Sequence, residues 1–327
     1  MTNEASTASV VIPNWNGRHW LPRCLDAVSR QELAPSEVIV IDNGSTDGSL
    51  EYLLREHPEV QVLTMGQNTG FAHAANAGLR AAGSELVALI NTDVVLEPDW
   101  LARVVPAIFS SEDVASVACK MLDLADAALV YDAGDVLRRD GACEQRGRFE
   151  RDDGRWDQPG EVFGACAGAA LYRRRAVLDL GGFDERFFAY LEDVDLALRL
   201  RLTGWRCRYE PAVARHAGGG SSDQLPHGHE YLVERNTLFL VARYFPVSWL
   251  PLVGYRQAGW AWHALRDRRI GPHLRGALAG LAMLPRALRD RREGVIGACV
   301  PIDVVMPRLP IRGPSAGGHP SARAPRG

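Results

Sequence analysis

The sequence lacks a membrane-spanning segment, a signal peptide and a disulfide framework. Apolar stretches near the C-terminus are interrupted by Pro, Arg or Gly well short of the roughly 20 residues that a membrane helix needs. Residues 1–7 are polar and carry neither the basic nor the apolar region of a secretory signal. The six cysteines are widely scattered, with no CxxC pair and no metal-ligand spacing. We therefore expect reduced thiols in a cytoplasmic protein.

Lysine is almost absent as well. Lys120 is the only one, so arginine carries nearly all of the positive charge. The net charge is −3, but thirteen arginines face five acidic residues in residues 231–312, whereas residues 1–230 carry a net charge of −13. We predict a main domain over residues 1–230, a basic amphipathic helical extension over 231–312 and a disordered tail over 313–327. No nucleic-acid partner is expected.

The first part of the chain alternates short apolar runs with segments of helical spacing. Each run is followed by a polar loop, which is typical of a doubly wound α/β sheet. The predicted strands are 9–13, 37–41, 60–64, 85–90 and 114–121, and the predicted helices are 18–30, 49–56, 74–82 and 98–109.

The second part of the chain is less regular. Residues 123–162 are charged and glycine-rich, which predicts an irregular or hairpin-bearing excursion over one edge of the sheet. Residues 190–202 predict a helix with an apolar face. The other expected elements are a strand over 205–209, a flexible loop over 215–222 that carries His216, and helices over 173–181, 234–245 and 274–288.

Two groups of acidic residues are candidates for chemistry. A buried strand ends at Asp93, and a carboxylate at the carboxyl end of such a strand points into the crevice where open α/β sheets bind ligands. Asp is also a common turn residue. Glu192, Asp193 and Asp195 lie in the first turn of the predicted helix 190–202, where the helix dipole alone favours negative charge. The residues by themselves leave both interpretations open.

Five motifs in order resemble the family 2 glycosyltransferases of GT-A fold, and most of all their bacterial rhamnosyltransferase-type members that build cell-surface polysaccharides. The motifs are SVVIPNWN (9–16), VIDNGSTDG (40–48), NTGFA (68–72), LINTD (89–93) and GGFDERFFAYLEDVD (181–195). The resemblance implies a Rossmann-like, doubly wound mixed sheet followed by a C-terminal helical extension.

The resemblance also implies roles for individual residues. Asp93 and His216 would hold Mg²⁺ or Mn²⁺, which suits oxygen ligands and one imidazole. Asn91 stands where the family's motif has its first acidic residue, so Asp93 would be the main anionic ligand. Asp193 would be the base that takes the proton of the acceptor hydroxyl, with Glu192 and Asp195 as supporting or acceptor-binding groups. The implied nucleotide- and substrate-binding residues are Pro13, Asn14, Asp42, Asn43, Ser45, Asn68, Gly70, Phe71, Ala72 and Asn91.

The implied activity is inverting transfer of a sugar from a nucleoside-diphosphate sugar to a hydroxyl of a glycan or lipid-linked acceptor. Thymidine-diphosphate rhamnose is the first expected donor, and uridine-diphosphate hexoses come next. The alternatives are a nucleotidyltransferase-like enzyme and a nucleotide-sugar-binding protein without transfer activity. The first would want a glycine-rich N-terminal phosphate loop with a basic residue, which we do not find, and the second could have lost Asp93 or Asp193, which are both present.

The basic last third has two interpretations. Segment 235–292 combines arginine with tryptophan, which suits a peripheral contact with the inner face of the cell membrane. It could equally form a helical subdomain that completes the core and makes a homodimer.

Overall fold

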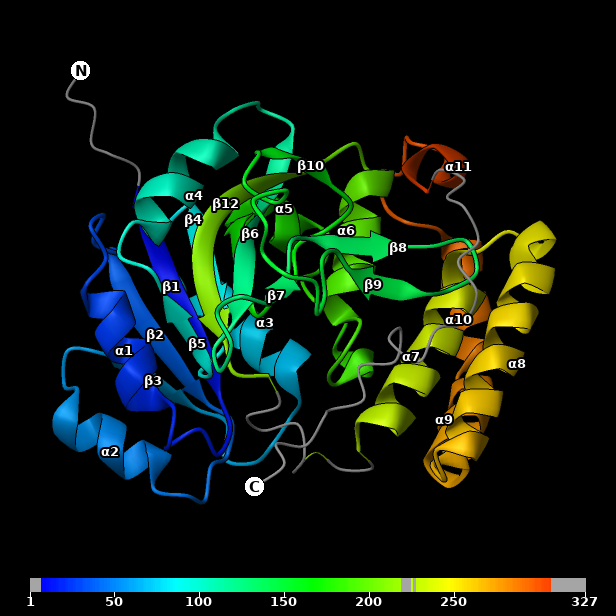
Figure 1. Cartoon of the computed structure of the whole chain (residues 1–327), viewed down its shortest axis with the longest axis horizontal. Coiled ribbons are helices and arrows are strands. Elements are labelled where there is room, and N and C mark those ends of the chain that lie inside the picture. The colour runs from blue at the N-terminus through cyan, green and yellow to red at the C-terminus, as the bar shows by residue number, and fades with distance from the viewer. Residues whose placement is uncertain (1–6, 219–224, 226–227, 307–327) are drawn as a thin grey trace.

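The computed structural model describes residues 7–218, 225 and 228–306. The tail predicted over residues 313–327 lies outside them. The strands are β1 (Ala8–Asn14), β2 (Glu37–Asp42), β3 (Gln61–Thr64), β4 (Leu86–Ile90), β5 (Val94–Leu96), β6 (Val114–Asp123), β7 (Val130–Asp132), β8 (Asp135–Leu137), β9 (Cys143–Gln145), β10 (Gly160–Val162), β11 (Ala169–Arg173) and β12 (Arg206–His216). The main sheet has the strand order β10-β12-β6-β11-β4-β1-β2-β3, with β5 on β12 and β7 on β6, while β8 and β9 form a separate hairpin (Figure 1).

Helices cover both faces of this sheet. They are α1 (Leu21–Ser29), α2 (Ser49–Glu56), α3 (Phe71–Ala81), α4 (Trp100–Ile108), α5 (Arg174–Asp179), α6 (Glu192–Leu202), α7 (His229–Tyr244), α8 (Leu250–Arg266), α9 (Ile270–Ala282), α10 (Leu284–Glu293) and α11 (Ile302–Val305). Helices α1, α2 and α4 contribute to the core on one face, whereas α3, α5 and α6 contribute to the core on the other. The predicted doubly wound mixed fold is confirmed.

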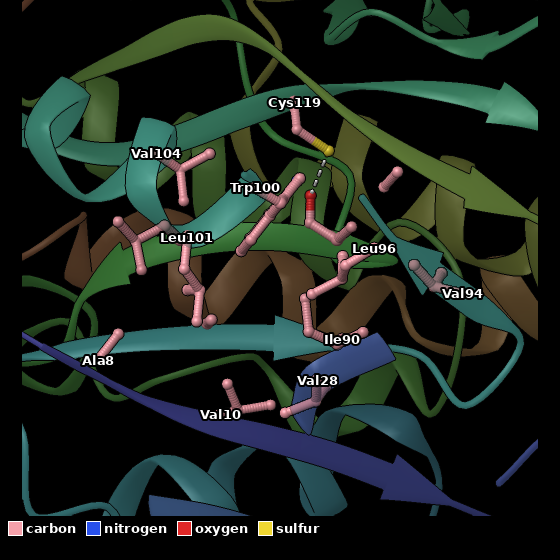
Figure 2. Close-up of a cluster of buried hydrophobic side chains, with 14 of the residues drawn as sticks. Ala8, Val10, Val28, Ile90, Val94, Leu96, Trp100, Leu101, Val104 and Cys119 are labelled. Carbon is pink, nitrogen blue, oxygen red and sulfur yellow. Dashed lines mark hydrogen bonds between the residues drawn. The ribbon is translucent and has the colours of Figure 1, made fainter. Parts of the chain in front are cut away.

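The strands supply both cores because successive side chains of a strand point to opposite faces. On β1, Val10 and Ile12 join the first core and Val11 joins the second. Figure 2 shows part of the first core, in which Val10, Val28 and Ile90 lie on the same side of the sheet as Trp100. Runs such as 86–90 therefore read as continuously apolar, although each residue faces only one layer of helices.

The strand directions bring the polar loops together. Strands β3, β2, β1 and β4 are parallel, and Asn14 at the end of β1 lies in register with Asp42 at the end of β2. Strand β11 runs antiparallel to β4 and β6, and β12 runs parallel to β6 but antiparallel to β5. The carboxyl ends of β1, β2 and β4 therefore meet at one edge of the sheet.

The expected flexible loop over residues 215–222 is wrong at its start, and its residues 219–222 lie outside the described part of the chain. Arg215 and His216 are the last residues of β12, where His216 pairs with Val94 of β5 and with Asp123 of β6. The strand passes through Pro211, and its register shifts between Tyr209 and Val213. A proline and a bulge interrupt the pattern that marks a strand, so the sequence signal ends early.

The predicted single helix over residues 274–288 is also wrong. The chain forms α9 and α10 with a break at Met283, and Pro285 stands in the first turn of α10. Proline lacks the N–H that a helix interior needs, but it fits the first turn, so a new helix begins there. No helix among the described residues is long and apolar enough to cross a membrane. All six cysteines are free, as expected.

A buried network of charges joins α6 to the C-terminal helices. Asp195 on α6 is fully buried and accepts hydrogen bonds from Arg199 (2.7 Å), Arg243 (2.7 Å) and the Tyr244 hydroxyl (2.8 Å). Arg243 on α7 also contacts Asp290 on α10 at 2.9 Å. Asp195 is thus occupied within the protein, and an acceptor-binding role for it is excluded by this burial. The predicted boundary at residue 230 stays a prediction.

We expect Asp195→Ala to destabilise the fold by about 3–5 kcal/mol, because it leaves buried guanidinium groups without their counter-charge. The free energy of unfolding in urea measures this loss. The control is Asp179→Ala, which removes an exposed i,i+4 pair with Arg175 and should cost less than about 0.5 kcal/mol. Equal losses of unfolding free energy in the two variants would contradict the proposed contribution of the network to stability.

Candidate active site

Asp93 and His216 lie side by side because β5 and β12 pair next to the end of β4. Both side chains are buried, and His216 Nε2 lies 3.4 Å from Asp93 Oδ1. The N–H of Ala217 donates to the Asp93 carbonyl at 3.0 Å, which fixes the two chain segments to each other. The structure thus brings the two predicted metal ligands together.

The imidazole of His216 is held on three sides. Its Nδ1 accepts a hydrogen bond of 2.8 Å from the N–H of Gly218, and its ring stacks on Tyr131 with centroids 4.3 Å apart. The guanidinium of Arg148 lies 3.8 Å from the centroid of Tyr131. Burial lowers the pKa of His216, so the ring is neutral at pH 7 and Nε2 carries its proton. Sequence reasoning missed Tyr131 and Arg148, which come from the irregular excursion.

The Asp93–His216 pair fits part of a divalent-cation site. A carboxylate oxygen and an imidazole nitrogen suit Mn²⁺ or Mg²⁺, but no group of three or more His, Cys, Asp or Glu side chains among the described residues could hold a metal ion. A Cβ on Gly168 would lie 3.5 Å from His216 Nε2 and 3.6 Å from Asn91 Nδ2, so glycine leaves room there. Coordination through Nε2 would require that nitrogen to give up its proton, and the remaining ligands would have to come from a substrate or water.

Asp193 is half-buried in the first turn of α6. Its Oδ2 accepts a hydrogen bond of 3.0 Å from the N–H of Ala167, and its Oδ1 accepts one of 2.8 Å from the N–H of Val194. Burial raises the pKa of Asp193, and the backbone hydrogen bonds oppose part of that rise. A carboxylate with a raised pKa is a stronger base than one in water, which suits proton abstraction near neutral pH.

The backbone before Asp193 is strained. Phe188, Tyr190 and Leu191 all adopt positive φ angles of 65° to 68°, which side-chain-bearing residues rarely do. The Asn236 amide on α7 holds this turn by donating to the carbonyls of Phe187, Ala189 and Tyr190 at 2.7–3.1 Å. Helix α7 therefore sets the backbone conformation from which Asp193 is presented.

Two further carboxyl groups, which the sequence did not single out, lie near Asp193. Burial raises the pKa of Asp132 to about 7, and burial together with the charges of Asp132 and Asp193 raises the pKa of Asp135 well above its usual value. Burial and the charge of Asp193 likewise raise the pKa of Glu192. Asp135 Oδ2 and Glu192 Oε2 are buried without a hydrogen-bond partner. The raised pKa values favour the neutral acid form of Asp135 and Glu192, whereas Asp132 is about half protonated near pH 7.

Five of the predicted nucleotide-pocket residues are joined by hydrogen bonds, and the N–H of Asn43 donates to the Asn14 carbonyl at 2.8 Å. Asn14 Nδ2 donates to Asp42 Oδ1 at 3.2 Å and to Ser45 Oγ at 3.1 Å. Asn43 Nδ2 donates to Asn68 Oδ1 at 3.1 Å, which ties the loop after β2 to the loop after β3. These polar groups come from three loops that meet at the carboxyl edge of the sheet.

The other predicted pocket residues pack in the protein interior next to these polar loops. Pro13 is buried in β1, and the Ala72 side chain is fully buried at the start of α3. The Phe71 ring packs edge-on against Phe183 with centroids 6.4 Å apart. Gly70 has a φ of 90°, and a Cβ there would lie 2.6 Å from the Phe188 carbonyl oxygen, so glycine is required. The nucleotide-binding role of all these residues stays a prediction.

Solved structures define the class of this fold. A structure of GalNAc-T7 with UDP, GalNAc and Mn²⁺ superposes with a TM-score of 0.62 at 15% identity, covering 78% of this chain and 51% of that one. A mannosyltransferase from Pyrobaculum calidifontis, in complex with GDP-Man and Mn²⁺, superposes with a TM-score of 0.52 at 18% identity, covering 91% and 77%. The fold is that of the GT-A glycosyltransferases.

Sequence comparison then gives the family. The model for Glycosyl transferase family 2 matches residues 9–181, which is more than half of the chain, and the chain belongs to this family. An N-acetylglucosaminyl-diphospho-decaprenol L-rhamnosyltransferase of Mycobacterium tuberculosis is 28% identical over 259 residues, 71% of this chain and 83% of that protein. A pre-mycofactocin glycosyltransferase of the same organism is 31% identical over 214 residues, 64% of this chain and 42% of that protein. The protein is thus a glycosyltransferase.

The buried carboxyl of Asp132 generates a prediction on pH and stability. Its pKa is about 7 in the fold and near 3.8 in an unfolded chain, so the unfolded state loses this proton first as the pH rises. Asp132 therefore lowers stability progressively from pH 4 to pH 7. We expect the urea midpoint of Asp132→Asn to fall less over this range than that of the wild type.

The matched control for this pH series is Asp179→Asn, at an exposed position. Its urea midpoint should follow the wild-type curve. Parallel curves for all three proteins would show that Asp132 is ionised in the fold.

Proposed function

We propose that this protein is an inverting glycosyltransferase that moves a sugar from a nucleoside-diphosphate sugar to a hydroxyl of a glycan or lipid-linked acceptor. The observation that carries the proposal is the position of residues 167–168. The N–H of Ala167 donates to Asp193, while the carbonyl of Gly168 accepts from the N–H of Asn91 at 2.8 Å, and Gly168 lies against His216. One dipeptide therefore holds the proposed base against the proposed donor site.

Asp193 is the proposed base. The acceptor oxygen attacks the anomeric carbon from the face opposite the diphosphate, the carbon–oxygen bond to the phosphate breaks, and the hydroxyl proton passes to an Asp193 oxygen. Two neighbouring carboxyl groups support this role, because the raised pKa values of Asp135 and Glu192 favour their neutral acid forms and leave Asp193 as the group that accepts the proton. Asp93 faces neutral His216 rather than this acidic cluster, so the two carboxylates have separate tasks.

The donor is bound in this proposal by the hydrogen-bonded loops. Asp42 would contact the base and ribose, with Asn14, Asn43 and Ser45 shaping the pocket. Asp93 and His216 would hold Mg²⁺ or Mn²⁺, which when bound neutralises charge on the leaving diphosphate. The rhamnosyltransferase among the relatives supports thymidine-diphosphate rhamnose as the first donor to test, followed by uridine-diphosphate hexoses.

The acceptor in this proposal belongs to cell-surface polysaccharide synthesis. The name of the mycobacterial relative specifies a sugar on a diphospho-decaprenol, which is a lipid-linked acceptor. An O-antigen biosynthesis protein of Myxococcus xanthus is 27% identical over 237 residues, 68% of this chain and 18% of that protein. A lipid-linked acceptor would be used by a cytoplasmic enzyme at the inner face of the cell membrane.

Asp193→Asn tests the base directly. The substitution keeps the shape and the contact to Ala167 but removes the basic carboxylate, so we expect kcat to fall at least about 100-fold while the donor Kd changes less than about twofold. Transfer assays and calorimetric titration with donor measure the two quantities. Full activity of this variant would refute the base assignment, and donor binding without transfer by the wild type would support a binding protein instead.

Metal dependence is tested on Asp93. Chelation of divalent cations should abolish transfer, and added Mn²⁺ should restore it. Asp93→Asn should weaken Mn²⁺ binding, measured by electron paramagnetic resonance in the presence of nucleoside diphosphate, at least about tenfold. Asp179→Asn, at an exposed position on α5, is the control for loss of an acidic side chain and should keep Mn²⁺ affinity. Transfer that persists through complete chelation would overturn the metal proposal.

Donor identity is tested by thermal shift. With Mn²⁺ present, thymidine-diphosphate rhamnose should raise Tm more than uridine-diphosphate hexoses or guanosine-diphosphate mannose at equal concentration, because the ligand that binds best stabilises most. A larger shift with another sugar nucleotide would replace rhamnose in the proposal.

A further inference from the structure

Large apolar side chains gather on the outside of the C-terminal helices. Twelve of the fifteen exposed large apolar side chains among the described residues lie between 247 and 304. Eight of them define what we call the outer helical face: Tyr255, Trp262 and Leu265 on α8, Leu274, Leu278 and Leu281 on α9, and Leu284 and Leu288 on α10. Figure 1 shows these helices at the edge of the molecule farthest from β3. Exposed large apolar side chains concentrated on one group of helices are typical of a site of interaction.

The packing of α9 against α7 directs this face outward. A Cβ on Gly276 would lie 2.6 Å from the Tyr231 carbonyl oxygen, and one on Gly280 would lie 2.9 Å from Leu238 Cβ. These two glycines allow close approach of the helices, so the inner side of α9 is fixed. Leu274, Leu278 and Leu281, at spacings of four and three, then form a stripe on the opposite side of α9. The exposure of this stripe is a consequence of the fold.

The charge around the outer helical face is strongly positive. Residues 250–293 contain nine arginines and three acidic residues. Arg256 is paired with buried Asp140, but Arg268, Arg275, Arg286 and Arg289 are exposed. Two copies of this face brought together would repel each other, whereas an anionic surface would attract it.

We propose that the outer helical face binds the anionic surface of a lipid bilayer. Leucine side chains would enter the boundary between headgroups and acyl chains, Trp262 and Tyr255 would lie at headgroup level, and the arginines would meet lipid phosphates. The biological use of this contact rests on the proposed lipid-linked acceptor. Helix α7 connects the two, because it packs on α9 and also holds the turn before Asp193 through Asn236.

Vesicle co-sedimentation tests the proposal. The full-length protein should bind vesicles of phosphatidylcholine with one-third phosphatidylglycerol, release as NaCl rises, and bind pure phosphatidylcholine at least about tenfold more weakly. The double variant Leu274→Ser/Leu278→Ser should lower partitioning to the anionic vesicles at least about tenfold, because two apolar anchors are lost. Equal binding to both kinds of vesicle, or no binding to either, would overturn the proposal.

The matched control is Leu54→Ser, which changes an equally exposed leucine on α2 and should leave vesicle binding unchanged. Light scattering tests the other occupant: a wild-type dimer that the double variant converts to a monomer would assign the face to a second copy of the chain and overturn the lipid proposal. Donor hydrolysis in the absence of vesicles should be equal in the wild type and the double variant. Hydrolysis without vesicle binding would reject the membrane contact alone, and vesicle binding without hydrolysis would reject the enzymatic proposal alone.

Discussion

A buried carboxylate must be matched by cations, and this requirement at Asp195 organises the molecule. Its partners come from α6 itself and from α7, and Arg243 extends the network to Asp290 on α10. The helix that presents Asp193 is thereby tied to the C-terminal helices. Breaking a buried ion pair costs several kcal/mol, so α6 and the C-terminal helices stabilise each other through this network.

The same first turn of α6 carries two acids with opposite environments. Asp195 is surrounded by cations and serves structure, whereas Asp193 lies among buried carboxyl groups and has a raised pKa. Two residues of one motif can differ in this way because a helix turns by about 100° per residue. One side of α6 faces α7, and another faces residues 164–167, where Gly164 leaves room beside Ala197 and Asp135.

The family match and the outer helical face belong to different parts of the chain. The match to the family covers residues 9–181 and fixes the class of chemistry, while the last third lies outside this match and carries most of the exposed large apolar side chains. Helix α7 contacts both parts. Its Asn236 holds the strained turn before Asp193, and its residues Tyr231 and Leu238 pack against α9. Helix α7 therefore links the proposed lipid-binding face to the proposed active site.

The sequence by itself determined the doubly wound sheet, because alternating apolar strands and helices and the polar loops after β1, β2 and β4 are local features. It also placed Asp93 and Asp193 at element ends. Only the tertiary structure decided that His216 ends a strand and that Asp132 and Asp135 lie beside Asp193, because strand pairing and burial join residues far apart in the chain. The sequence did not indicate Tyr131 and Arg148 for the same reason. Their contacts depend on how the irregular excursion folds, and its sequence shows neither helical nor strand periodicity.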